Sequence, residues 1–267
     1  MVRDGSQPNE RGTGRRSTTP RLPGTLYVVG TPIGHPDDIT LRALAVLRRV
    51  SLVASEDPLI TQALLAHHGI AATVTSYGPF NRHEKVLLLL HRLTQGQDIA
   101  LVSDNGTPII YDPGSLLVAA AHYAGIPVRA IPGPSTLTAA TAISGFSGDA
   151  IVFEGCLPST NQQLAQYLSH LRKEKKTLVF YVAPRALRGL LKTLTRTLPT
   201  RQTVIAMNLT TEKETLRRGR PDKLLDQIGR VAMDSAVTVV IEGYRAGSHR
   251  KKIFQKTLPT THLHGDG

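Results

Sequence analysis

Two turn-forming loops, each directly after a short apolar run, constrain this chain more than any other feature. The run 99–102 leads into residues 103–114, which contain two prolines, two glycines and two carboxylates. Such a mixture disfavours regular structure and favours a rigid turn that brings backbone close to a ligand. A similar loop, residues 30–38, follows the run 25–29. Ligands of open α/β sheets bind outside the carboxyl ends of strands, so the loops predict a small-molecule site between them.

Apolar runs and helix-period segments alternate through the middle of the chain, which predicts βαβ units and an α/β fold. The predicted strands are 25–29, 51–54, 72–75, 98–102, 127–131, 150–153, 177–181, 203–207 and 236–241. The predicted helices are 40–49, 59–68, 83–95, 115–123, 134–143, 161–173, 185–197 and 221–230.

A proline-glycine turn at residues 131–136 follows one predicted strand and indicates a boundary between two α/β lobes. The cleft between such lobes is a natural place for a cofactor of drug size. The segments at both ends are polar and lack apolar periodicity, which predicts disorder. The predicted organisation is a disordered basic arm at 1–23, an N-terminal lobe at 24–133, a C-terminal lobe at 134–243 and a disordered basic tail at 244–267.

The formal net charge of +12 favours a polyanionic partner, most simply RNA, because phosphate contacts dominate such binding. Both end segments are basic. Residues 1–23 hold five arginines against two carboxylates, and residues 244–267 hold five Lys or Arg against one. A solvated basic surface without a specific partner is the alternative interpretation.

The single cysteine, Cys156, excludes an internal disulfide and a cysteine-based zinc site, and fits a reducing, cytoplasmic location. No run approaches the ~20 consecutive apolar residues of a membrane span, so no membrane partner is expected. His67, His68, His262 and His264 have no carboxylate or cysteine at a recognisable ligand spacing, so they are interpreted as surface histidines and no metal is predicted.

Common nucleotide-binding and nucleophile motifs are absent from the sequence. There is no G-x-G-x-x-G after a strand, no G-x-x-x-x-G-K-[ST] and no G-x-S-x-G. The predicted site must therefore be built from the backbone of three loops, residues 30–34, 104–107 and 133–136. An isolated turn of this kind is more often structural, but all three directly follow predicted strands.

An ordered set of motifs resembles the ribosomal RNA small subunit methyltransferase I family of the tetrapyrrole methylase superfamily. The resemblance covers about 24–243 and rests on residues 26–34, 38–44, 55–57, 100–108, 112–114, 132–135, 154–158 and 178–181. It implies a class III methyltransferase fold of two α/β lobes with S-adenosylmethionine in the interlobe cleft. It also implies a homodimer and 2′-O-methylation of a cytidine in 16S rRNA of the small ribosomal subunit.

The resemblance also implies which residues bind the cofactor. The expected cofactor-binding residues are Pro32, Ile33, Asp104, Gly106, Thr107, Gly133, Ser135 and Thr136. Asp104 has an independent physical role, because a carboxylate after a strand can accept a hydrogen bond from a ribose hydroxyl or an ammonium group. Its structural alternative is a loop cap.

Attack by a 2′-hydroxyl needs a proton acceptor, for which Glu56 and Asp57 are the first candidates. Both directly follow a predicted strand. Their structural alternative is capping of the helix at 59–68. Asp112 and Glu214 are further carboxylate candidates, and His83 is a weaker one.

Several charged positions depart from the family pattern. Residues 58–61, 182–186 and 207–211 read Pro-Leu-Ile-Thr, Val-Ala-Pro-Arg-Ala and Met-Asn-Leu-Thr-Thr, where the family carries more charged residues. The donor-binding loops match while these segments do not. Two alternatives to an rRNA methyltransferase therefore remain: a methyltransferase with another acceptor, such as a tetrapyrrole or a different RNA, and a catalytically inactive cofactor-binding relative.

Overall fold

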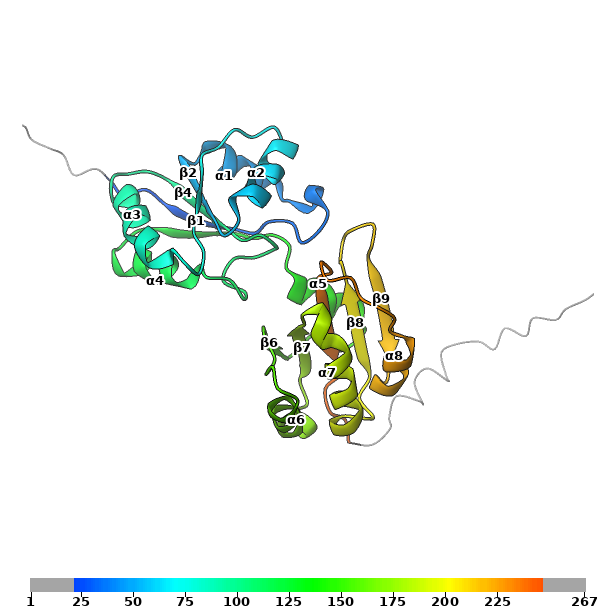
Figure 1. The fold of residues 1–267 in the computed structure, drawn as a ribbon. Coiled ribbons are helices and arrows are strands. Elements are labelled where there is room, and N and C mark those ends of the chain that lie inside the picture. Colours follow the sequence, from blue (N-terminus) through cyan, green and yellow to red (C-terminus); the bar gives the residue numbers. More distant parts are fainter. Residues whose placement is uncertain (1–21, 247–267) are drawn as a thin grey trace, which may run out of the picture.

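The computed structural model describes residues 22–246, so the predicted arms at 1–23 and 244–267 lie almost wholly outside the described residues. The chain forms two five-stranded sheets, each with its own helices (Figure 1). The first sheet is entirely parallel, with the order β3-β2-β4-β1-β5. Its strands are β1 (Leu26–Val29), β2 (Leu52–Ser55), β3 (Val74–Ser76), β4 (Ile99–Val102) and β5 (Val128–Ile131).

Helices cover both faces of the first sheet, which is why its central strands are continuously apolar rather than alternating. One face packs against α1 (Leu41–Arg49) and α2 (Pro58–His67). The other packs against α3 (Arg82–Thr94) and α4 (Ser115–Tyr123). A short 3-10 helix, η1 (Pro36–Asp38), precedes α1. We call this sheet and its helices the first lobe.

The second sheet is mixed, with the order β6-β7-β10-β8-β9. Only its β6–β7 pair of neighbours is parallel, and the other three pairs are antiparallel. The strands are β6 (Ile151–Glu154), β7 (Thr177–Tyr181), β8 (Thr203–Met207), β9 (Thr215–Gly219) and β10 (Val237–Ile241). The α/β prediction is confirmed, but in this sheet the predicted βαβ arrangement holds only for β6-α6-β7, because the other strand pairs are antiparallel. β9 was not predicted because it is a polar edge strand, exposed from Thr215 to Arg218.

Four helices belong to the second sheet, and with it they form the second lobe. Their bounds are α5 (Thr136–Ser144), α6 (Asn161–His170), α7 (Pro184–Thr197) and α8 (Pro221–Gln227), with a 3-10 turn η2 (Leu171–Lys173) after α6. Helices α6, α7 and α8 share one apolar core with the sheet, and α5 packs on the other face. The same α5 core includes Ile33 of the first lobe, so an apolar contact crosses between the lobes.

The loops that follow β1, β4 and β5 are joined to one another at the edge of the first sheet. Gly30 and Gly133 approach so closely that a Cβ on Gly133 would lie 2.7 Å from the Gly30 carbonyl oxygen. The backbone N–H of Thr31 donates to the Gly106 carbonyl at 3.0 Å. The Thr107 hydroxyl donates to the Pro134 carbonyl at 3.0 Å. The loops therefore form one connected unit.

Among residues 22–246, none of the helices combines the length and the apolar character that crossing a membrane requires. The predicted boundary between residues 133 and 134 lies in the loop that connects β5 to α5, and it stays a prediction.

The close contact between Gly30 and Gly133 predicts that one methyl group added at Gly133 lowers the stability of the fold. Gly133→Ala places its Cβ against backbone atoms of Gly30, which cannot move without displacing β1. We expect the free energy of unfolding to fall by about 1–3 kcal/mol, the usual cost of overpacking. The matched control is Gly229→Ala, because a Cβ there meets no atom within 4 Å. Urea denaturation measures both variants, and equal stabilities would contradict the contact.

Candidate active site

A cavity of about 510 Å³ lies between the two lobes. The first lobe contributes the ends of the loops after β1, β2 and β4, and the second contributes the ends of β6 and β7, the start of α7 and the segment before β10. The lining residues are Ile33, Glu56, Ser103, Asp104, Asn105, Ile110, Tyr111, Thr136, Gly155, Cys156, Tyr181, Val182, Ala183, Pro184 and 235–238. Its volume is within the range of about 300–1,000 Å³ that is typical of small-molecule sites.

Aromatic rings join the lobes at one wall of the cavity. The rings of Tyr181 and Phe153 lie 4.8 Å apart, and Tyr111 of the first lobe lies 6.2 Å from Tyr181, both in edge-to-face geometry. Such ring pairs stabilise the fold by more than their buried area alone would give. Burial raises the pKa of the Tyr181 hydroxyl, while hydrogen bonds with the Leu137 backbone and Thr136 oppose that rise. This wall is therefore neutral and largely apolar.

The loop that carries Tyr111 has an unusual backbone. Ile109 and Tyr111 have φ values of 78° and 62°, which side-chain-bearing residues rarely adopt. Tyr111 also packs over Gly155, where a Cβ would lie 2.3 Å from its ring. Strained residues of this kind cluster at functional sites, where surrounding structure holds them. The packing of Tyr111 on Gly155 is one such restraint.

Carboxylates gather at the ends of β2 and β4. Burial raises the pKa of Glu56, and the nearby charges of Asp104, Asp112 and Asp57 raise it further. Burial likewise raises the pKa of Asp104, against a hydrogen bond from the Asp57 backbone N–H at 2.9 Å. One Asp112 oxygen accepts from the Gly114 N–H, and the other is buried without a hydrogen-bond partner among the described residues. A cation in the cavity would relieve this mutual repulsion.

The two adjacent candidates for a proton acceptor have different surroundings. The Asp57 carboxylate caps α2 by accepting from the Leu59 N–H at 2.9 Å, and Asp57 does not line the cavity. Glu56 lines the cavity and carries the raised pKa. The structural alternative that the sequence left open thus describes Asp57, while Glu56 is the one of the two that lines the cavity.

The predicted cofactor residues divide into those that line the cavity and those that shape it. Ile33, Asp104 and Thr136 line it. Gly106, Thr107 and Gly133 hold the three loops together, as described above. Gly106 has a φ of +92°, and a Cβ there would press on Ile33 at 3.0 Å.

The remaining predicted residues lie outside the cavity lining. Pro32 lines a second hollow of about 340 Å³, which shares Asp104 and Asn105 with the main cavity. Ser135 stands at the N-cap of α5 without a capping hydrogen bond from its side chain. The Glu214 carboxylate accepts from the Thr210 N–H at 2.6 Å, and His83 lies in the first turn of α3.

Sequence reasoning missed most of the wall that the second lobe provides. Tyr181 and Gly155 belong to motifs that were recognised, but not as site residues. Residues 235–238 carry no sequence signal for a site, because they are the first two residues of the apolar strand β10 and the two residues before it. Only the antiparallel placement of β10 beside β7 and β8 brings them to the cavity.

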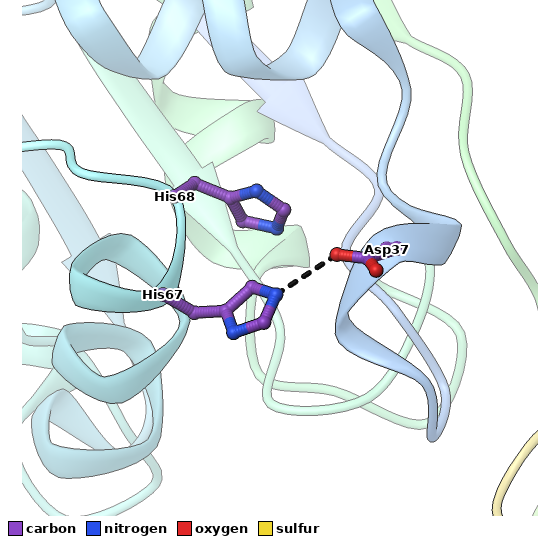
Figure 2. A group of neighbouring side chains, drawn as sticks. All are labelled: Asp37, His67 and His68. Carbon is purple, nitrogen blue, oxygen red and sulfur yellow. Dashed lines mark hydrogen bonds and ion pairs between the residues drawn. The ribbon is translucent and has the colours of Figure 1, made fainter.

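The adjacent histidines at the end of α2 have a carboxylate neighbour that the sequence did not indicate. His67 Nε2 lies 2.8 Å from Asp37 Oδ1, and His68 lies beside both (Figure 2). Asp37 belongs to η1, thirty positions earlier, so no local ligand spacing exists. The fold alone brings these groups together.

Comparison with known proteins identifies the family. The model of the tetrapyrrole (corrin/porphyrin) methylases matches residues 25–225, three quarters of the chain. The chain belongs to this family. A relative named ribosomal RNA small subunit methyltransferase I, from Micromonospora olivasterospora, is 40% identical over 237 residues, covering 87% of this chain and 75% of its own. One of the same name from Thermotoga maritima is 36% identical over 220 residues, covering 82% and 99%.

Solved structures of tetrapyrrole methylases share the fold. A cobalt precorrin-4 methyltransferase superimposes with a TM-score of 0.61 at 20% identity, covering 82% of this chain and 94% of its own. The uroporphyrin-III C-methyltransferase from Thermus thermophilus, complexed with S-adenosylhomocysteine, gives 0.59 at 21%, covering 82% and 97%. As a member of the tetrapyrrole methylase family, the present chain is a methyltransferase, and S-adenosylmethionine is its methyl donor.

The residues of the cavity fit this cofactor. Its positively charged sulfonium and ammonium groups suit a cavity lined by Glu56 and Asp104, whose pKa values are raised chiefly by burial and further by neighbouring carboxylates. Its apolar and aromatic parts suit the side of Ile33 and Tyr181. Gly30 and Gly133 approach so closely that no side chain fits between the loops after β1 and β5, beside the cavity.

The raised pKa of Glu56 predicts a pH-dependent gain in stability for Glu56→Gln. Folding holds the Glu56 proton more tightly than the unfolded chain does, so its contribution to stability is lost as pH rises from 4.5 through the raised pKa. We therefore expect this variant to melt at a higher temperature than the unsubstituted chain at about pH 8, with the difference shrinking as the pH falls.

Asp57→Ala provides the contrast. It removes the cap of α2 and should lower stability by about 0.5–2 kcal/mol. Thermal unfolding followed by circular dichroism measures both variants. A melting temperature of Glu56→Gln below that of the unsubstituted chain at about pH 8 would show that the Glu56 charge is stabilised by its surroundings instead.

Proposed function

We propose that this methyltransferase acts on the small ribosomal subunit and methylates a ribose 2′-hydroxyl of a cytidine in 16S rRNA. The relatives named ribosomal RNA small subunit methyltransferase I support the RNA substrate, because two of them match 82% or more of this chain at 36–40% identity. The net charge of +12 supports a polyanionic partner. A homodimer and a cytoplasmic location belong to the same proposal.

The observation that carries the mechanism is the position of Glu56 in the cavity with a raised pKa. A carboxylate whose pKa lies above its ordinary value is a stronger base, and so better matched to a hydroxyl proton. S-adenosylmethionine supplies an electrophilic methyl group on a positively charged sulfur. Glu56 would accept the proton of the attacking 2′-hydroxyl as the hydroxyl oxygen forms its new bond to the methyl carbon, and the cofactor would supply a neutral thioether as the leaving group.

The other residues of the cavity position the reactants. Asp104 is held by the Asp57 N–H and accepts a hydrogen bond from a hydroxyl or ammonium group of the cofactor. Ile33 and Thr136 line the cavity from the β1 loop and the start of α5. Tyr111 and Tyr181 limit the access of water between the lobes. We assign binding to Ile33, Asp104 and Thr136, and loop shaping to Pro32, Gly106, Thr107, Gly133 and Ser135.

Transfer of a labelled methyl group to small subunits that lack ribose methylation, followed by mapping of the labelled nucleotide, tests the proposal. We expect label on a 16S rRNA cytidine. Glu56→Gln should lower the rate by about 10²–10⁴-fold, the usual contribution of a general base, while S-adenosylmethionine still binds. Asp57→Asn is the matched control, because asparagine also caps helices, and it should keep most of the activity.

The outcomes separate the parts of the proposal. Label on a base instead of a ribose would overturn the 2′-hydroxyl assignment. Binding of S-adenosylmethionine without transfer to any small subunit would move the search to another acceptor, such as a tetrapyrrole. An equal loss of the methyl-transfer rate in Glu56→Gln and Asp57→Asn would show that Glu56 is not the general base.

Arg185 offers a test of how the RNA is held. It directly follows Pro184 of the cavity wall, and its side chain is exposed at the N-terminus of α7. A phosphate there would meet both a guanidinium and the positive end of the helix dipole. We expect Arg185→Ala to weaken binding of the small subunit and to reduce the slope of log affinity against log salt by about 1.

Arg196→Ala is the control for Arg185→Ala, because it removes an exposed arginine at the other end of the same helix, roughly 16 Å away. It should leave both the affinity and the slope nearly unchanged. Filter binding over a range of salt concentrations gives both quantities. Identical behaviour of the two variants would mean that the cavity rim does not contact phosphate.

A further inference from the structure

Three side chains with metal-binding atoms converge where α2 ends opposite η1. Asp37, His67 and His68 each offer one ligand atom, and these atoms all lie within 4.8 Å of one another. Figure 2 shows both imidazole rings extending from the end of α2 toward Asp37 across the gap. None of the three lines the 510 Å³ cavity. The cluster is therefore separate from the proposed active site.

Local structure explains why both rings face the same loop. His67 is the last residue of α2, and His68 is its C-cap with φ and ψ of −95° and 11°. This change of conformation at the helix end allows successive side chains to point to one side. His68 Nε2 lies 3.1 Å from the Pro36 carbonyl, and the two rings meet edge to face at 4.7 Å.

The distances are close to those that a metal ion imposes. Tetrahedral ligands about 2.0–2.1 Å from a zinc ion lie roughly 3.3 Å from one another. The His67–Asp37 contact is already 2.8 Å, and the widest separation of 4.8 Å needs a closure of about 1.5 Å. His67 and Asp37 are 47% and 63% exposed, so rotation of their side chains meets little resistance. That exposure also leaves room for water as a fourth ligand.

We propose that Asp37, His67 and His68 bind a divalent transition-metal ion, with Zn²⁺ as the best match. Two imidazoles and one carboxylate suit zinc and its neighbours, whereas Mg²⁺ and Ca²⁺ prefer oxygen ligands alone. Without a metal, His67 contacts Asp37 and His68 contacts the Pro36 carbonyl, and a metal ion would take ligand atoms from all three side chains at once.

The ion would act as a structural link. It would join η1, in the loop that contains Pro32 and Ile33, to the end of α2, the helix that follows β2 and Glu56. His67 also lines the second hollow together with Pro32 and Gly34. Metal binding would therefore fix two segments that otherwise meet through the His67–Asp37 and His68–Pro36 hydrogen bonds.

Calorimetric titration of Zn²⁺ into the full chain, freed of metal by a chelator and of any affinity tag, tests the site. We expect one high-affinity ion per chain and a higher melting temperature when it is bound. Asp37→Asn and His68→Ala should each weaken the affinity at least tenfold, since even changes behind the ligands cost about 10–100-fold. Co²⁺ should replace Zn²⁺ and give the visible absorption of a low-coordinate nitrogen and oxygen site.

The tail histidines need their own control. A variant with His249, His262 and His264 all changed to alanine should bind Zn²⁺ as the unsubstituted chain does. Loss of binding in this variant would place the metal in the tail and overturn the proposal. Affinity unchanged by Asp37→Asn and by His68→Ala would overturn it as well. Neither readout depends on methyl transfer, so the result is independent of the proposed function.

Discussion

The contact between the Gly30 and Gly133 backbones fixes the positions of the loops on which the rest of the site depends. It brings the loops after β1 and β5 to within van der Waals distance, and the Thr31–Gly106 hydrogen bond adds the loop after β4. Because the three strands are neighbours in one parallel sheet, their carboxyl ends already share an edge. The contact turns that edge into one rigid surface, from which Ile33 and Asp104 face the second lobe.

Burial and like charge then give this surface its chemistry. Glu56 and Asp104 follow adjacent strands; burial raises the pKa of both carboxyl groups, and the charge of Asp104 raises the pKa of Glu56 further. A protein that keeps such a pair sacrifices stability, which is common where function requires a strained arrangement. The neighbouring Asp57 avoids this cost by capping α2. Two successive acidic residues thus have separate roles, one structural and one facing the cavity.

Much of the first lobe was predictable, because its apolar strands and the loops after them carry strong local signals. The cofactor loops and the α/β class follow from those signals together with the family motifs. The second sheet was harder, since β9 is a polar edge strand and residues 235–238 become part of the cavity only through antiparallel pairing. The partnership of Asp37 with His67 and His68 depends on two elements meeting in space, which no spacing along the chain reveals.

A crystal structure of the chain with S-adenosylhomocysteine tests the central claim most directly, namely that the connected loops form the wall of the cofactor site. The account predicts the ligand in the interlobe cavity, in contact with Ile33, Asp104 and Thr136, and with its sulfur on the side of Glu56. A ligand bound instead in the hollow beside Pro32 and His67, or away from both lobes, would contradict it.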